Sequence, residues 1–263
     1  MRAKLGKIRW SAWLWLFIFQ PYLYAQTGSM PLDEIVAHME AARLESKGSV
    51  PFLVTREYRM YHGDEQKPTS EVTAQINVVP PHEREYKILE SKGNDRGEKV
   101  VRKILDHESA AERLSTPPTA IVRDNYDFSY VGEDIVEGVK CHVLEIKPKR
   151  KEPGLIDGRA WVDPHSFLIR KIQGQLAKSP SWWVRGVEVV VLFNLMDGIW
   201  TQTYSNAVAD VKVLGRYTVR AQATSLHKSD EVASKRRNPV RLPHAYRRSL
   251  PGSIYPPGVM IPR

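Results

Sequence analysis

The stretch "GRAWVDPHSFLIRKIQG", residues 158–174, predicts a β-hairpin. Residues 159–162 and 167–172 contain the aromatic and β-branched side chains that favour strands. Between them, "DPHS" has the composition of a chain reversal, because Asp163 can accept turn hydrogen bonds through its side chain and Pro164 presets the backbone φ. We therefore expect two neighbouring antiparallel strands joined by a turn.

The same turn contains Asp163, His165 and Ser166, which are the residue types of a Ser-His-Asp hydrolase. Adjacent residues of a strand point to opposite faces, so His165 and Ser166 could meet only in an irregular turn. The Gly-x-Ser-x-Gly pattern of a nucleophile elbow does not surround Ser166. The pattern favours a structural turn, and we expect no catalytic residues and no enzymatic activity.

Further strands are predicted on both sides of this hairpin. Their separators are mostly short and rich in Gly, Pro and Asp, as hairpin turns require, and parallel pairing would need much longer crossovers. We expect mostly antiparallel strands at 50–61, 70–79, 83–91, 126–133, 139–148, 157–163, 166–176, 182–195, 199–213 and 216–224.

Two helices are predicted, one at 29–48 and one at 95–114. The first has apolar residues at helical spacing, and the second combines an apolar stripe with the capping-box spacing of Asp95 and Glu98. The two stripes consist of Leu32, Ile35, Val36, Met39 and Ala42, and of Val100, Val101, Ile104 and Leu105.

These elements predict one α+β domain dominated by a large antiparallel sheet. Two helices are too short to cover a sheet of about ten strands, a size at which sheets tend to curl. The surplus apolar face could close on itself as a packed barrel, or it could remain as a cavity. This imbalance is the first indication of a binding function.

The net charge of +9 over 263 residues comes from the two ends of the chain. Residues 1–25 have four basic and no acidic residues, and residues 227–263 have eight basic and two acidic residues, which leaves about −1 for the middle. A nucleic-acid groove on the domain is therefore not expected. Segment 1–25 has the pattern of a signal peptide cleaved after Ala25, so we expect export to the periplasm, with an uncleaved anchor as the alternative.

The domain is expected to span residues 26–226, followed by a disordered Pro/Arg-rich tail at 227–263. The alternative for the tail is peripheral contact with an anionic membrane. The single cysteine, Cys141, excludes an intrachain disulfide and favours a buried, inert thiol. No two histidines have the short spacing of a local metal motif, and we expect neither a metal nor a cofactor.

The segments "GVKCHVLEIKPK" and "GRAWVDPHSFLIRKIQ", within this order of elements, resemble the periplasmic lipoprotein-carrier superfamily, which includes LolA, LolB, RseB and LppX. The resemblance implies an incomplete barrel, a large curved antiparallel sheet wrapped around two helices, with an apolar cavity for acyl chains. It also implies an inward-facing arginine after the first helix, and Arg56 is the matching position. A solvent-facing Arg56 on a twisted edge strand is the alternative.

We therefore expect an exported, noncatalytic carrier or sensor for a lipid, a lipidated protein or another hydrophobic ligand, with outer membrane lipoprotein sorting as one such role. The candidate cavity residues are Val54, Arg56, Tyr58, Met60, Ile76, Val78, Trp161, Phe167, Ile169, Val189, Val191 and Tyr217. The alternative is an envelope regulatory or assembly module that binds a partner protein. Trp182 and Trp183 are the candidate anchors for that partner, because aromatic side chains are frequent interface hot spots.

Overall fold

The computed structural model describes residues 30–47, 50–80, 83–114 and 117–228, so the expected signal peptide and residues 229–263 of the expected tail lie outside the described part. The helices are α1 (Leu32–Lys47) and α2 (Asp95–Glu112). The strands are β1 (Phe52–His62), β2 (Ser70–Val79), β3 (Glu83–Gly93), β4 (Tyr126–Val136), β5 (Val139–Pro148), β6 (Ile156–Val162), β7 (Ile169–Leu176), β8 (Val184–Met196), β9 (Ile199–Val211) and β10 (Gly215–Lys228).

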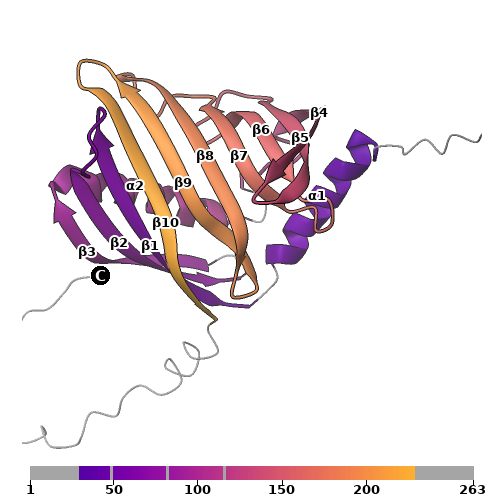
Figure 1. Ribbon diagram of the computed structural model, residues 1–263, viewed down its shortest axis with the longest axis horizontal. Helices are drawn as coiled ribbons and strands as arrows, with labels where there is room; N and C mark the ends of the chain where they lie inside the picture. Colours follow the sequence, from indigo (N-terminus) through magenta and orange to yellow (C-terminus); the bar gives the residue numbers. More distant parts are fainter. Residues whose placement is uncertain (1–29, 48–49, 81–82, 115–116, 229–263) are drawn as a thin grey trace, which may run out of the picture. The chain divides into compact units, whose positions relative to one another are not determined.

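All ten strands form one antiparallel sheet in the order β3-β2-β1-β10-β9-β8-β7-β6-β5-β4 (Figure 1). The outer strands β3 and β4 are consecutive in the chain, yet they lie at opposite edges because α2 connects them. The described sheet is therefore open. The expected α+β fold, an incomplete antiparallel barrel with two helices, is confirmed, and the alternative of a closed barrel is wrong.

Two hairpins of the sheet have tight two-residue turns. Glu137–Gly138 joins β4 to β5 and Asp197–Gly198 joins β8 to β9, and all four residues have positive φ. Positive φ at both central residues is what type I′ turns require, and these turns match the twist of the flanking strands. The Gly and Asp separators of the sequence therefore set the register of these pairs.

The N-terminus of α2 differs from the expected capping box. Asn94, not Asp95, is the N-cap, with extended backbone angles and a side-chain oxygen that accepts a hydrogen bond from Gly97 N at 3.2 Å. A Cβ on Gly97 would lie 2.0 Å from Ser70 Oγ, so this glycine permits the close approach of α2 to β2.

The two helices lie at opposite ends of the sheet (Figure 1). Helix α2 packs on β2 and β3, where its Val101 and Leu105 join a core with Val54, Tyr58 and Ile76. Helix α1 contacts β4 at the other end. A second core, separate from the first, contains Tyr126, Ile146, Leu155, Ala160 and Ile172. The sheet between the two helices is the part that neither of them covers.

The hairpin predicted at 158–174 is confirmed, but its connection is longer than "DPHS". Val162 pairs with Ile169, so the connection runs from Asp163 to Leu168 and Phe167 lies outside β7. At the end of the chain, β10 extends to Lys228, two residues beyond the expected domain boundary, because Lys228 pairs with Phe52. Within the described ranges, neither helix is long and apolar enough to span a membrane.

Candidate functional site

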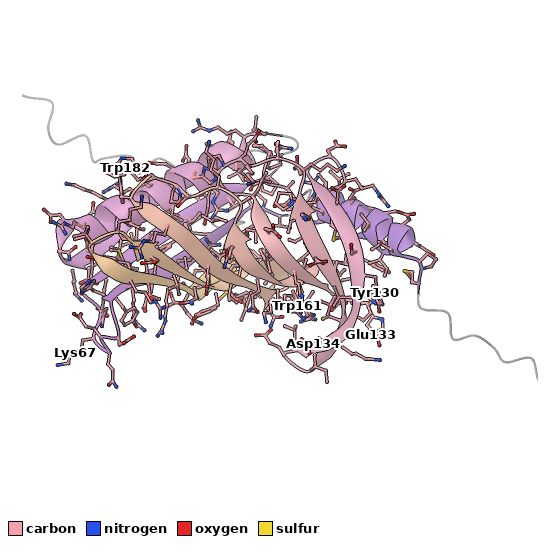
Figure 2. All side chains as sticks on the ribbon, turned by 90° about the horizontal axis from the view of Figure 1, so that it is seen from above. Lys67, Tyr130, Glu133, Asp134, Trp161 and Trp182 are labelled. Atoms are coloured by element: carbon pink, nitrogen blue, oxygen red, sulfur yellow. The ribbon has the colours of Figure 1, made fainter. Side chains whose placement is uncertain are left out.

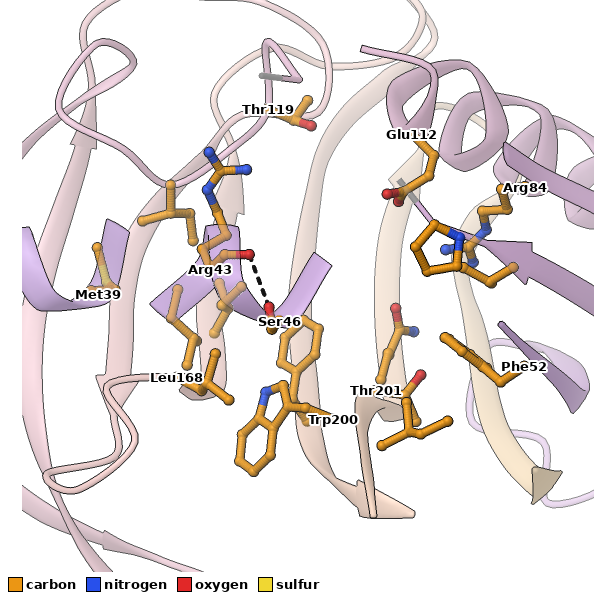
Figure 3. A pocket seen from close by; sticks show the side chains of 18 of the residues that line it. Met39, Arg43, Ser46, Phe52, Arg84, Glu112, Thr119, Leu168, Trp200 and Thr201 are labelled. Carbon is orange, nitrogen blue, oxygen red and sulfur yellow. Dashed lines mark hydrogen bonds between the residues drawn. The ribbon is translucent and has the colours of Figure 1, made fainter. Parts of the chain in front are cut away.

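A half-open cavity of about 400 Å³ lies between α1 and α2, over the uncovered part of the sheet (Figure 3). Its volume is within the roughly 300–1,000 Å³ that is typical of small-molecule sites. Apolar side chains of α1, β1 and β6 to β9 form much of its surface. They include Met39, Phe52, Ile156, Ile169, Ile172, Phe193, Ile199 and Trp200.

One wall of the cavity contains an ion-paired cluster. Arg56 of β1 is only 3% exposed, and its Nη1 donates to Oε2 of Glu108 on α2 at 3.2 Å. Arg84 of β3 donates to the same carboxylate oxygen. The cluster connects β1 and β3 to α2 through a single carboxylate, and it excludes the alternative of a solvent-facing Arg56.

The electrostatics of this cluster keep Glu108 ionised. Burial disfavours the charged carboxylate, but the charges of Arg84 and Arg56 outweigh burial and hold the pKa of Glu108 below its ordinary value. Because two guanidinium groups share this one carboxylate, removing it would leave both without their counter-ion.

The opposite wall is α1, which contributes Met39, Arg43 and Ser46. Figure 3 shows Arg43 and Ser46 on this side and Arg84 and Glu112 across the cavity. Helix α1 is fixed by Arg123, whose backbone N and guanidinium Nη1 donate to the carboxylate of Glu40 at 2.6 and 3.1 Å. These bonds position the helix that faces the cavity.

The connection between β6 and β7 closes against α1. Phe167 lines the cavity and stacks on His38, with ring centroids 4.6 Å apart. The backbone of Phe167 has φ +55°, which is uncommon for a bulky residue and is held by its N–H bond to Asp163 O at 3.0 Å. The turn therefore holds an aromatic ring against the cavity.

Asp163 organises this turn. Its Oδ1 accepts the backbone N–H groups of His165 and Ser166 at 2.9 Å each, and its Oδ2 accepts Arg170 Nε at 2.6 Å. Burial acts against ionisation, yet these bonds and the charge of Arg170 lower the pKa of Asp163 to about 2.

This geometry differs from a catalytic triad, because the carboxylate of Asp163 binds backbone groups and Arg170 rather than the ring of His165. Ser166 Oγ accepts from Leu168 N. These hydrogen bonds hold the turn in its observed conformation. Within the described ranges, no three His, Cys, Asp or Glu side chains are grouped as metal ligands would be.

Only some of the predicted cavity residues line the cavity. Arg56, Val78, Phe167 and Ile169 do so. Others on the same face fill the cores beneath it or beside it. Val54, Tyr58 and Ile76 pack under α2, Met60 is buried, Val191 packs against the second core, and Val189 is half-buried outside the lining.

Trp161 was expected in the cavity but lies on the other face of the sheet (Figure 2). It packs against Val136, Cys141 and Val143, and its Nε1 donates to Asp134 Oδ2 at 3.0 Å. The neighbouring Ala160 pairs with Ile172 and faces the inside, so strand alternation turns Trp161 outward. Cys141 is buried beside it, and burial raises the pKa of its thiol.

The remaining candidates lie away from the cavity. Tyr217 of β10 packs on His62, with ring centroids 4.7 Å apart. Trp182 and Trp183 lie in the connection between β7 and β8, and Trp182 is 80% exposed. They form a T-shaped pair with centroids 5.6 Å apart.

The sequence contained a signal for the α1 wall that the prediction missed. Arg43 follows Met39 by four residues and Val36 by seven, so it continues the buried stripe of α1, and Ser46 follows three residues later. A charged residue at a core position of an amphipathic helix indicates a polar requirement inside the fold. Phe193, Ile199 and Trp200 had no comparable signal, because each belongs to a strand without clear alternation.

No family model matches the sequence, and no curated protein matches it. Similar solved structures include a DUF1329 family protein from Desulfovibrio piger, with 14% identity over 79% of this chain and 97% of the other and a TM-score of 0.42. A LolA superfamily protein from Nitrosomonas europaea is 12% identical over 76% and 94% of the two chains, with a TM-score of 0.39.

The lipoprotein LppX from Mycobacterium tuberculosis is 12% identical over 74% of this chain and 95% of the other, with a TM-score of 0.25. A LolA superfamily protein and LppX, two of these similar structures, bear names that the predicted resemblance also gives. These similarities identify no ligand and no activity for this chain.

Proposed function

We propose that the protein is an exported, noncatalytic carrier or sensor that binds a lipid, a lipidated protein or another hydrophobic ligand between α1 and α2. The observation that carries this proposal is the cavity of about 400 Å³ with its apolar surface of Phe, Ile and Trp side chains. Each CH₂ group of a ligand that entered it would contribute about 0.8 kcal/mol, so one acyl chain would be enough for useful affinity.

The position of the cavity also supports this function. It lies where the sheet has no helical cover, and structural elements fixed by the Arg56–Glu108 and Arg123–Glu40 bonds surround it. Sites that are formed in advance bind with a smaller loss of conformational entropy. A role in lipoprotein sorting would be one form of this function.

Native purification tests the proposal. The protein would be expressed with its full N-terminal segment, purified without detergent from the periplasmic fraction, and extracted for lipid mass spectrometry. We expect export and a co-purifying amphiphile at near-stoichiometric amounts. Absence of any such compound, together with failure to bind a fluorescent acyl probe, would contradict the carrier function.

A second candidate function is partner binding at the end of the sheet that carries Trp182 and Trp183. Lys212 N donates to Trp183 O at 2.8 Å, so the β7–β8 and β9–β10 connections lie together there. Val213 and Leu214 of the second connection are also exposed. Exposed aromatic and aliphatic side chains in one place are typical of an interaction surface, and an envelope protein is the partner that we propose for this alternative.

A further inference from the structure

Arg43 is an unusual residue in the cavity because two of its guanidinium nitrogens are buried without a partner among the described residues. Its Nε and Nη1 atoms are buried and have no hydrogen-bond partner among the described residues. Helix α1 places this side chain at the cavity, on the same face as the buried Met39. Burial of these two nitrogens costs free energy, since they have lost water without gaining a hydrogen-bond partner.

The other charged groups of the cavity do not compensate Arg43. Arg56 and Arg84 both donate to Glu108, so this carboxylate is already paired. Glu112 lies across the cavity and has an interaction of its own, and Glu83 lies at the exposed start of β3. In the described part of the chain, Arg43 forms an ion pair with neither of these carboxylates.

We propose that the cavity binds single-chain amphiphiles with an anionic headgroup, and that Arg43 holds this headgroup while the acyl chain lies on the apolar surface of β7 to β9. This inference rests on the proposed function and specifies its ligand class. The shared headgroup chemistry is a carboxylate or a phosphate monoester, because a guanidinium presents a planar fork of N–H donors that matches both anions.

The composition of the cavity agrees with a ligand of this kind. Arg43 stands at the α1 wall, whereas Ile169, Ile172 and Phe193 form an apolar surface without a charged group of their own. A volume of about 400 Å³ is near the lower end of ligand sites, which favours one chain over several. An amphiphile would match both parts at once.

Competition binding would test this inference. In this assay, competitors are titrated against a bound neutral fluorescent acyl probe. Dodecanoate, dodecyl phosphate and dodecan-1-ol share one acyl chain and differ only in the headgroup. Acetate and inorganic phosphate are the control competitors, because they have an anionic headgroup and no chain. We expect wild-type protein to prefer at least one anionic amphiphile over the alcohol by tenfold or more, and the stronger of the two identifies the headgroup. The chainless anions should not displace the probe.

The Arg43→Gln variant should lose this preference while its affinity for dodecan-1-ol stays within about twofold. Arg96→Gln is the matched control, because Arg96 is an exposed helical arginine outside the cavity, and it should retain the wild-type preference. Without ligand, Arg43→Gln should melt at the same temperature as wild type or higher, since it removes two buried guanidinium nitrogens that lack hydrogen-bond partners.

Three results would overturn the inference. Equal affinity of wild type for the alcohol and both anions would reject the headgroup role and leave the carrier function intact. Parallel loss of alcohol binding, or a lower melting temperature, in Arg43→Gln would assign Arg43 a structural role. Binding of no amphiphile by wild type would reject the inference and the carrier function together.

Discussion

Arg56 donates from Nη1 to Oε2 of Glu108 at 3.2 Å and thereby links β1 to α2 at the wall of the cavity. Arg84 shares this carboxylate. The three side chains connect β1 and β3 to α2, and Arg56 and Arg84 line the cavity. Ion pairs therefore stabilise the wall of the cavity on this side, whereas apolar side chains of the sheet form the surface of the cavity beneath it.

Because two arginines share the carboxylate of Glu108, replacing Glu108 should destabilise the protein more than replacing Arg56. Glu108→Gln should lower the free energy of unfolding by about 3–5 kcal/mol, because both arginines lose their counter-ion. Arg56→Met should cost less, about 1–2 kcal/mol, because Glu108 keeps Arg84. Urea denaturation of the two variants measures the difference, and equal losses would contradict a shared carboxylate.

Asp163 predicts a specific dependence of stability on pH. Its pKa is lowered to about 2 in the folded protein, so its contribution is present above its ordinary pKa and is lost as the pH falls from about 4 to 2. The pKa difference corresponds to about 2 kcal/mol. The stability of wild type minus that of Asp163→Asn should shrink over this range, and a difference that is constant with pH would contradict the assignment.

The order of elements was predictable from the sequence because hairpin turns have strong local signals. Pairs such as Asp197–Gly198 adopt positive φ at little cost and separate strands of characteristic composition. The openness of the sheet was not predictable in this way, since it depends on α2 connecting two opposite edges. The turn at Asp163 was predicted, but its extension to Leu168 depends on the left-handed backbone of Phe167, a conformation that bulky residues seldom adopt.

The candidate site was less predictable than the fold. Trp161 was expected in the cavity as part of the apolar surface of the hairpin, although its small neighbour Ala160 is the residue that faces inward. Size alone does not decide which face of a strand is buried when both faces carry apolar side chains. For Arg56 the resemblance implied an inward-facing residue and a solvent-facing one was the open alternative, and the structure buries it, whereas Arg43 would have required attention to the helical stripe of α1.

The position of Trp161 predicts that this residue contributes to stability but not to ligand binding. Trp161→Phe should reduce stability by about 1–2 kcal/mol, because it loses buried area and the hydrogen bond to Asp134. The affinity for an acyl probe should stay within about twofold of wild type, because the side chain lies on the other face of the sheet. A large loss of probe affinity without further loss of stability would place Trp161 at the ligand.

The surface with Trp182 and Trp183 is predicted to contribute to partner binding but not to ligand binding. If an envelope protein binds there, changing both residues to Ala should abolish capture of one reproducible partner from envelope extracts and leave acyl-probe affinity unchanged. Leu89→Ala is the control, because Leu89 is exposed on β3 at the edge of the sheet. Retention of the partner by the double variant, or its loss in the control, would contradict this surface as the binding site.

The most direct test of the account is titration of a fluorescent acyl probe into wild type, Ile169→Trp and Ile135→Trp. Ile169 lines the cavity, so a larger side chain there should fill it and weaken probe binding by at least tenfold. Ile135 is exposed on β4 outside the cavity, so the same substitution there should leave binding unchanged. Saturable binding that only Ile169→Trp weakens is the predicted result, and equal binding by all three proteins, or by none, would contradict a ligand cavity between α1 and α2.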